Sequence, residues 1–188
     1  TEKAIAKARE TGVGIGAVCH IGHYVHRAMQ AGCTAFSVQG AYPQYYVDNK
    51  DGQAAYYGNP PLCFGLPSED EPPLVLDGAT CIMADYQRGE QFDALQELIP
   101  AAFFKSMGYT GAATALGGAF VGMNNPRAQA LTEKWSAARS GGLIIVMDLG
   151  LFAPPEEFCT GVDNLVRGVR ETMAPVRGYS EATLPGTI

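Results

Sequence analysis

A chain of 188 residues is long enough to bury a hydrophobic core, and 47% hydrophobic against 17% charged residues excludes a largely disordered protein. The formal net charge of −6 argues against nucleic acid or an anionic membrane as a partner, because both attract clustered lysine and arginine. The longest apolar runs, such as residues 143–147, are far too short to span a bilayer. The five cysteines are widely spaced and form no Cys-x-x-Cys pair, which favours reduced thiols in a cytoplasmic protein.

The hydrophobic pattern and the placement of Gly, Pro and Asn predict alternating helices and strands. We expect helices at residues 2–10, 24–31, 92–98, 109–121, 128–138 and 155–173. Strands are expected at residues 13–19, 34–39, 74–76 and 142–148, with a loop-rich stretch over residues 40–73. The strands at 13–19 and 142–148 have the composition of buried strands, and the 109–121 helix is rich in small residues that allow close packing. Together these elements predict an α/β fold with a mixed sheet flanked by helices.

Residues 12–17 read GVGIGA, which matches the letters of a dinucleotide-binding loop. That loop functions when a strand precedes it and a helix follows it, so that the helix N-terminus meets the pyrophosphate. Here a helix is predicted before the motif, and a strand contains it. We therefore interpret the motif as a helix stop at Gly12 followed by a strand.

All three histidines lie close together in the sequence, as His20, His23 and His26. Histidines three residues apart on a helix can share a metal ion, but no further ligand lies nearby at a typical spacing. One of them could act as a general acid or base, since imidazole titrates near neutral pH and sites gather at strand ends. A purely structural cluster is the third interpretation.

Four polar residues elsewhere are candidates for binding. Asn59 precedes a proline and is held extended, which would direct its amide over the loop, although a simple turn is the alternative. Asp77 and Thr80 are predicted at a strand end and the following turn, where they could hold a ribose or an amide, or Asp77 could cap a helix. Lys105 is predicted just before a helix start, where it would suit a phosphate, or it could be an ordinary surface lysine.

Six short motifs occur in an order that resembles the malate/L-lactate dehydrogenase family, which is distinct from the Rossmann-type lactate dehydrogenases. The motifs are HIGHYV, YYGNP, VLDGATC, KSMGY, GLIIVMDLGLF and LPGT. The family includes ureidoglycolate, sulfolactate and diketogulonate dehydrogenases and the piperideine-carboxylate reductases. The resemblance runs over nearly the whole chain and implies a non-Rossmann NAD(P)-binding fold with a mixed, largely antiparallel sheet flanked by helices.

The resemblance also implies an activity: NAD(P)H-dependent hydride transfer to or from a small 2-oxo or 2-hydroxy acid, or a cyclic imino acid. The cofactor would be NAD or NADP, the other partner a small-molecule substrate, the assembly a homodimer, and no metal is expected. His23 would be the catalytic acid/base, and Asn59 would bind substrate. The cofactor-binding residues implied are Asp77, Ala79, Thr80, Lys105, Ser106, Pro185 and Gly186.

The chain departs from the family pattern at several positions. Ile21 and Val25 replace the small residues that flank the family's histidine, and Thr187 replaces a terminal acidic residue. The family's N-terminal helical segment, with its S-H-G-x-x-R motif, is absent. We therefore expect residues 1–188 to be a single unit that covers the cofactor-binding domain and part of the catalytic domain. The alternatives are a catalytically inactive or truncated ligand-binding remnant of the same fold and, more distantly, a metal-dependent hydrolase or lyase built on the histidines.

Overall fold

The computed structural model describes residues 1–18, 24–41, 59–83, 89–134 and 140–186. Its strands are β1 (Val13–Val18), β2 (Cys33–Ala41), β3 (Pro61–Leu66), β4 (Leu74–Ala79) and β5 (Ser140–Asp148). Its α-helices are α1 (Glu2–Thr11), α2 (Tyr24–Gln30), α4 (Glu90–Leu98), α5 (Pro100–Thr114), α6 (Pro126–Lys134) and α7 (Pro155–Thr172). A π-helical segment, η2 (Ala115–Phe120), continues α5, and a short 3-10 turn, η3 (Leu149–Leu151), follows β5.

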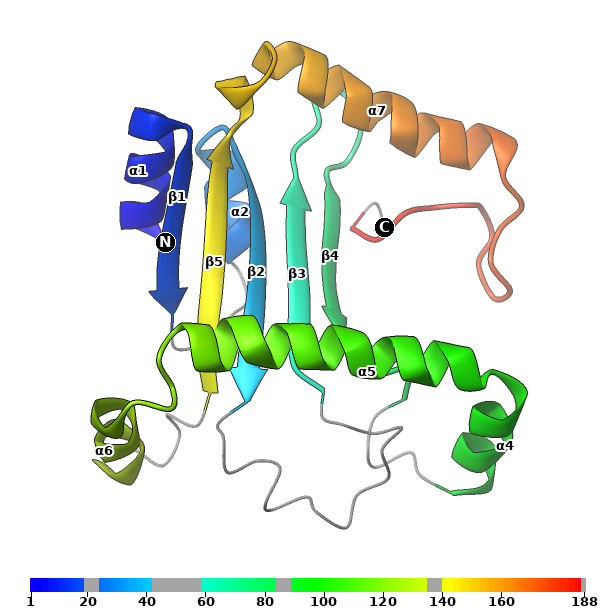
Figure 1. The fold of residues 1–188 in the computed structure, drawn as a ribbon. Helices are drawn as coiled ribbons and strands as arrows, with labels where there is room; N and C mark the ends of the chain where they lie inside the picture. Colours follow the sequence, from blue (N-terminus) through cyan, green and yellow to red (C-terminus); the bar gives the residue numbers. More distant parts are fainter. Residues whose placement is uncertain (19–23, 42–58, 84–88, 135–139, 187–188) are drawn as a thin grey trace.

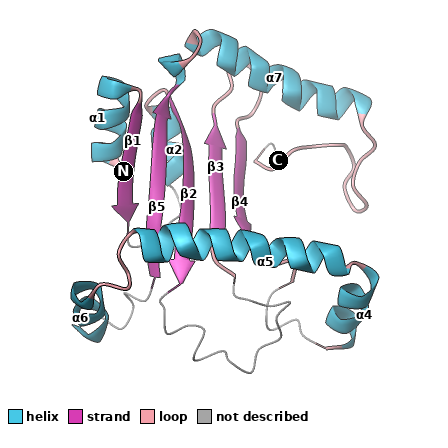
Figure 2. Ribbon diagram, in the orientation of Figure 1, coloured by secondary structure: helices cyan, strands magenta, loops and turns pink. Residues whose placement is uncertain are grey.

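The strands form one sheet in the order β1-β5-β2-β3-β4, and each pairing within the described residues is antiparallel. β5 lies between β1 and β2, so a strand from late in the chain separates two strands from its beginning (Figure 1). Helices lie along the sheet and across its ends (Figure 2). This architecture confirms the predicted α/β class and the largely antiparallel sheet.

The two faces of the sheet carry different helices. On one face, apolar residues of α1 and α2 pack on Cys33, Ala35, Cys63 and other residues of the central strands. On the other face, α5 and η2 pack on Val38 and Leu143. Strand periodicity explains the division, since successive side chains point to opposite faces. α7 runs across the opposite end of the strands from α5 (Figure 1).

Three glycines allow η2 to contact the sheet backbone. A Cβ atom on Gly117 would lie 2.3 Å from the Gly40 nitrogen, and a Cβ atom on Gly40 would lie 2.0 Å from the Gly118 nitrogen. A Cβ atom on Gly141, in β5, would lie 2.4 Å from the Gly117 carbonyl oxygen. The close packing predicted for this small-residue helix is therefore confirmed, and it is a contact of backbone on backbone.

The first helix and the strand after it follow the prediction. Gly12 adopts a left-handed conformation with φ 87°, and its N–H donates to the Ala8 carbonyl at 2.6 Å, which ends α1. β1 then contains the rest of the GVGIGA motif, so the interpretation as a helix stop followed by a strand is confirmed. The prediction that this strand is buried is wrong in part: β1 is an edge strand, and Ile15 is 60% exposed.

Two elements in the middle of the chain differ from the prediction. β3 lies in the stretch expected to be loop, where prolines and glycines hide its alternating pattern. Its proline, Pro61, stands at the first position of the strand, where proline is tolerated. α5 begins at Pro100 rather than at residue 109, since proline suits the first turn of a helix. Lys105 is therefore in the second turn of α5, and the expected free N–H groups of a helix start do not surround it.

The remaining elements agree within a few residues. β4 extends beyond the predicted residues 74–76, so Asp77 lies inside the strand and is not a helix cap. The helix predicted at 128–138 begins at Pro126 and is described as far as Lys134. Among the described residues, the helices are all too short or too polar to cross a bilayer.

Candidate functional site

A pocket of about 730 Å³ lies between the sheet and α5. Its sheet wall is apolar and includes Phe36, Leu62, Phe64 and Leu76 from three adjacent strands. The Phe36 and Phe64 rings lie side by side on β2 and β3, with centroids 4.7 Å apart. At one end of the pocket the chain turns as it leaves β4. The pocket forms because η2 contacts the sheet closely while α5 stands farther from β3 and β4.

Four of the seven predicted cofactor residues line this pocket: Ala79 and Thr80 at the end of β4, and Lys105 and Ser106 on α5. Ser106 and Thr80 are buried, whereas Lys105 is exposed and therefore lies at the rim. Lys105 places a positive charge beside an otherwise apolar space. The residues come from segments about 25 positions apart in sequence, which the packing of α5 on the sheet brings together.

Thr80 joins three segments, namely its own turn, the turn at Pro60 and α5, and we call this group of contacts the Thr80 junction. Its N–H donates to the Pro60 carbonyl at 3.3 Å, and its carbonyl accepts from the Ser106 hydroxyl at 2.5 Å. Its side-chain oxygen accepts from the Thr110 hydroxyl at 2.8 Å. Both backbone polar groups of Thr80 are therefore bonded within the protein, and its hydroxyl is paired with that of Thr110.

Asn59 supports the same turn from the other side. Its side-chain oxygen accepts from the Cys81 N–H at 3.0 Å. The Asn-Pro pair therefore does aim its amide at a neighbouring segment, namely the residue after Thr80. The predicted role of Asn59 in binding substrate stays a prediction, since in this arrangement its oxygen holds the turn.

Asp77 lies away from the pocket lining. It pairs in register with Cys63, whose side chain belongs to the core beneath α1 and α2, and strand alternation puts Asp77 on that same face. Burial, and then the negative charge of Asp77, raise the pKa of the Cys63 thiol to about 11. The predicted cofactor residues are thus divided between the two faces of β4.

Pro185 and Gly186 lie beside the other end of β4. The Pro185 carbonyl accepts from the Val75 N–H at 3.1 Å, and a Cβ atom on Gly186 would lie 2.6 Å from the Val75 nitrogen. Gly186 also has φ 86°, which glycine adopts without strain. These contacts fix the C-terminal segment against β4. They do not join it to the pocket lining.

The predicted acid/base, His23, lies outside the described residues, as does His20. His26 is described and lies on the exposed side of α2. Within the described ranges, no group of His, Cys, Asp and Glu side chains is arranged to hold a metal ion. The predictions about His23 and about metal therefore stay predictions.

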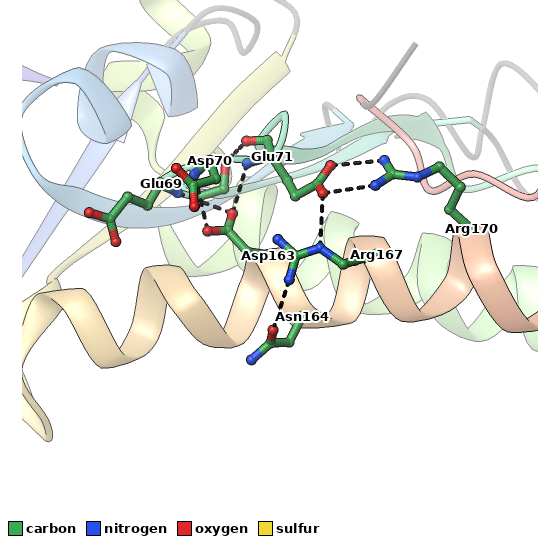
Figure 3. Close-up of polar contacts among 8 residues, drawn as sticks. Glu69, Asp70, Glu71, Asp163, Asn164, Arg167 and Arg170 are labelled. Atoms are coloured by element: carbon green, nitrogen blue, oxygen red, sulfur yellow. Dashed lines mark hydrogen bonds and ion pairs between the residues drawn. The ribbon is translucent and has the colours of Figure 1, made fainter.

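A charged cluster that we did not predict joins α7 to the turn between β3 and β4 (Figure 3). The buried carboxylate of Asp163 accepts from the N–H groups of Glu69, Asp70 and Glu71 at 3.0–3.2 Å. Glu71 accepts from Arg170 through two bonds of 2.8 Å. Arg167 approaches the same glutamate at 3.4 Å. We call this group the α7 clamp.

Ionisation of the α7 clamp follows from these contacts. Burial opposes the charge of Asp163, but hydrogen bonds from the N–H groups of Asp70, Glu71 and Glu69 outweigh it and lower the pKa of that carboxyl. The hydrogen bonds and charge of Arg170, with those of Arg167, lower the pKa of Glu71. The spacing of Asp163, Arg167 and Arg170 puts them on one side of α7, which is the sequence signal that could have indicated the cluster.

Comparisons with known proteins agree with this architecture. A family model described as malate/L-lactate dehydrogenase matches residues 1–91. The ureidoglycolate dehydrogenase (NAD(+)) of Escherichia coli O157:H7 is 26% identical over 215 aligned positions, which cover 98% of this chain and 61% of that protein. The chain thus spans about three fifths of the length of the curated relatives it matches.

Solved structures share the fold at low sequence identity. Sulfolactate dehydrogenase from Methanocaldococcus jannaschii matches with a TM-score of 0.65 and 22% identity, over 98% of this chain and 61% of that one. Malate dehydrogenase from Pyrococcus horikoshii OT3 matches with a TM-score of 0.70 and 18% identity, over 98% and 59%.

Proposed function

We propose that this chain functions as an NAD(P)-dependent oxidoreductase of the malate/L-lactate dehydrogenase family, because the model of that family matches residues 1–91 and a ureidoglycolate dehydrogenase is 26% identical over 98% of the chain. The substrate would be a small 2-hydroxy or 2-oxo acid, or a cyclic imino acid. The observation that supports this proposal is the pocket beneath α5, because Ala79, Thr80, Lys105 and Ser106 were expected to bind the cofactor from their motifs and all four line it.

The lining of the pocket suits a nucleotide. An apolar wall that includes Phe36 and Phe64 would take a flat ring, and the Lys105 ammonium at the rim would take a phosphate. When bound, a nicotinamide cofactor supplies or accepts the hydride. The protein's part is to orient the ring and to exclude water. The Thr80 junction would hold the turn at the end of β4 in place for this.

Proton transfer would be the role of His23, in the HIGHYV motif. His23 directly precedes α2 in the sequence, and α2 packs on the face that carries Asp77. We propose His23 as the group that gives a proton to, or takes it from, the substrate oxygen or nitrogen.

We also propose that the protein is a homodimer. The residues of α5 and η2 from Pro100 to Phe120 include one charged side chain, Lys105. Phe104 and Phe120 are 77% and 70% exposed, and a helix apolar on nearly all sides is usually covered on all sides. Light scattering should give twice the chain mass, and a monomer at micromolar concentration would contradict the proposal.

Titration of the protein with NADH and with NADPH tests the proposed cofactor, with protein fluorescence as the signal. Lys105→Ala should weaken binding by about 1–3 kcal/mol through loss of a charge-assisted contact. Lys7→Ala is the matched control, since Lys7 is on α1 and pairs with Glu10. If the unaltered protein binds neither nucleotide, the oxidoreductase proposal is wrong.

Turnover provides the second test. A panel of 2-oxo acids and cyclic imines should be reduced with the nucleotide that binds. His23→Ala should leave nucleotide affinity near normal and lower turnover by about 10²–10⁴-fold, the usual contribution of a positioned proton donor. His26→Ala should have a much smaller effect. Equal losses from both substitutions would point to a structural role for the histidines.

A further inference from the structure

We propose that Thr110 is a positioning residue for the bound nucleotide: it holds the Thr80 side chain so that the Thr80 hydroxyl donates a hydrogen bond into the pocket. The inference rests on the proposed function, since it concerns the same pocket. Thr110 was not among the residues that the sequence indicated. It lies one helical turn after Ser106 on α5 and is buried, with 1% of its surface exposed.

The hydrogen bonds of the Thr80 junction determine which groups remain for a ligand. A hydroxyl group can donate one hydrogen bond and accept two. The Thr110 and Thr80 hydroxyl oxygens lie 2.8 Å apart. We assign Thr110 as the donor, so that Thr80 accepts in this pair and keeps its own hydrogen. Thr80 lines the pocket. The free hydrogen is therefore available to a ligand there.

Ser106 fixes the backbone of the same turn, and its predicted contact with the cofactor stays a prediction. Its hydroxyl hydrogen is used on the Thr80 carbonyl, so it holds the backbone of the turn. Ser106 and Thr110, at positions i and i+4 of α5, thus bind the backbone and the side chain of one residue. Two contacts from one helix fix both the position and the rotamer of Thr80. A ligand then meets a donor that needs no reordering, which lowers the entropic cost of binding.

The pocket chemistry defines the ligand group that Thr80 would meet. Since the sheet wall is apolar, a buried hydroxyl donor at Thr80 favours a ligand with an oxygen acceptor at that depth. Lys105 is one residue before Ser106 and places a positive charge at the rim. A ring with a polar edge followed by a phosphate, as in a nucleotide, satisfies both groups.

The chain offers a matched control on the same helix. Thr114 lies one turn after Thr110, and its hydroxyl oxygen is buried with no hydrogen-bond partner among the described residues. Thr114→Val therefore makes the same chemical change as Thr110→Val without removing a hydrogen bond. Thr110→Ser keeps the hydroxyl and removes only a methyl group. Thr110→Ala is a second deletion of the hydroxyl that cannot introduce a clash.

The experiment is titration of the full chain with NADH, or with NADPH if that nucleotide binds more tightly. Thr110→Val and Thr110→Ala should raise the dissociation constant about 3- to 10-fold, the usual contribution of one neutral hydrogen bond. Thr110→Ser and Thr114→Val should stay within about twofold of the unaltered protein. Thermal unfolding of each variant is followed in parallel.

A double-mutant cycle separates positioning from a general structural effect. If Thr110 acts through the Thr80 hydroxyl, Thr80→Val alone should weaken binding as much as Thr80→Val combined with Thr110→Val. Fully additive losses would overturn the inference, as would equal effects of Thr110→Val and Thr114→Val. If the unaltered protein binds nucleotide and Thr110→Val binds it equally well, this inference alone is wrong. If the unaltered protein binds none, the proposed function is wrong and the inference falls with it.

Discussion

The two ends of the helix formed by α5 and η2 meet the same sheet in different ways. At the η2 end, Gly40, Gly117 and Gly141 allow backbone to touch backbone, and no space remains. At the α5 end, the helix stands off β3 and β4 and leaves a pocket of about 730 Å³. There the contact is made by two hydroxyl groups, those of Ser106 and Thr110, on one turn of chain.

The difference shows how one helix can both close a core and border a binding site. The closed end fixes the position of the helix by shape alone, because a side chain of any size would collide there. The open end fixes its orientation by directional hydrogen bonds, which act across a gap without filling it. Substitutions at the closed end should therefore change stability, whereas those at the open end should also change binding.

The largest effect is expected at the closed end. Gly117→Ala would put a Cβ atom 2.3 Å from the Gly40 nitrogen, and backbone cannot move aside as a side chain can. We expect a loss of about 3 kcal/mol in the free energy of unfolding, measured by urea denaturation, because overpacking shifts the backbone. Gly111→Ala on the same helix is the control, since a Cβ atom there meets nothing within 4 Å. It should gain about 0.5–1 kcal/mol through helix propensity. Equal outcomes for the two variants would show that the ends are not different.

An intermediate effect is expected at the open end. Ser106→Ala leaves the buried Thr80 carbonyl without its donor and should cost about 1–3 kcal/mol of unfolding free energy. Thr114→Val removes a hydroxyl that has no partner among the described residues and should be within about 0.5 kcal/mol of neutral. Denaturation curves of both variants at neutral pH provide the measurement. A Ser106→Ala protein as stable as the control would mean that the Ser106 hydrogen bond is not needed to hold the Thr80 turn.

The smallest effect at neutral pH is expected from the carboxylates of the α7 clamp. Their response to acid sharpens the comparison, because the contacts of α5 and η2 with Thr80 and with the sheet glycines are uncharged. The pKa values of Asp163 and Glu71 are lowered in the folded chain, so their stabilisation is present above the unfolded values, about 3.9 and 4.3, and is lost as pH falls below them. The thermal midpoint should drop between pH 5 and pH 3. Asp163→Asn should have a lower midpoint at pH 7 and a weaker acid dependence. An unchanged acid dependence in Asp163→Asn would place the sensitive carboxylates elsewhere.

Several elements were predicted correctly because a short stretch of sequence carries the whole signal for them. Gly12 ended α1 as expected, and the apolar run of β5 and the long amphipathic pattern of α7 predicted a strand and a helix correctly. β3 was missed because proline and glycine obscure its alternation, and α5 begins at Pro100 rather than at the predicted residue 109. Gly108 is tolerated in α5, since helix interiors accept single glycines at a modest cost.

The sequence predicted which residues belong to the candidate site better than it predicted how they are arranged. The motifs indicated Thr80, Lys105 and Ser106, and the structure brings these three to one pocket. The reason given for Lys105, a helix start, was wrong. The roles of Thr110 and of the α7 clamp depend on how α5 and α7 pack against turns that are distant in the sequence. A single sequence carries little information about packing between segments tens of residues apart. The division of Asp77 from Thr80 by the faces of β4 required the full extent of that strand.

The position of β5 between β1 and β2 has a consequence for the order in which the chain is made. β1 and β2 leave the ribosome before β5, yet they are not neighbours in the sheet. The strand that lies between them, β5, ends at Asp148. Until the chain has been synthesised as far as Asp148, β1 therefore has no partner among the described strands, and β2 has only β3. The sheet is completed late, by insertion of a strand into a waiting gap, and its assembly depends on contacts between distant parts of the chain. Such a topology is expected to fold slowly and to expose unpaired strand edges while synthesis continues.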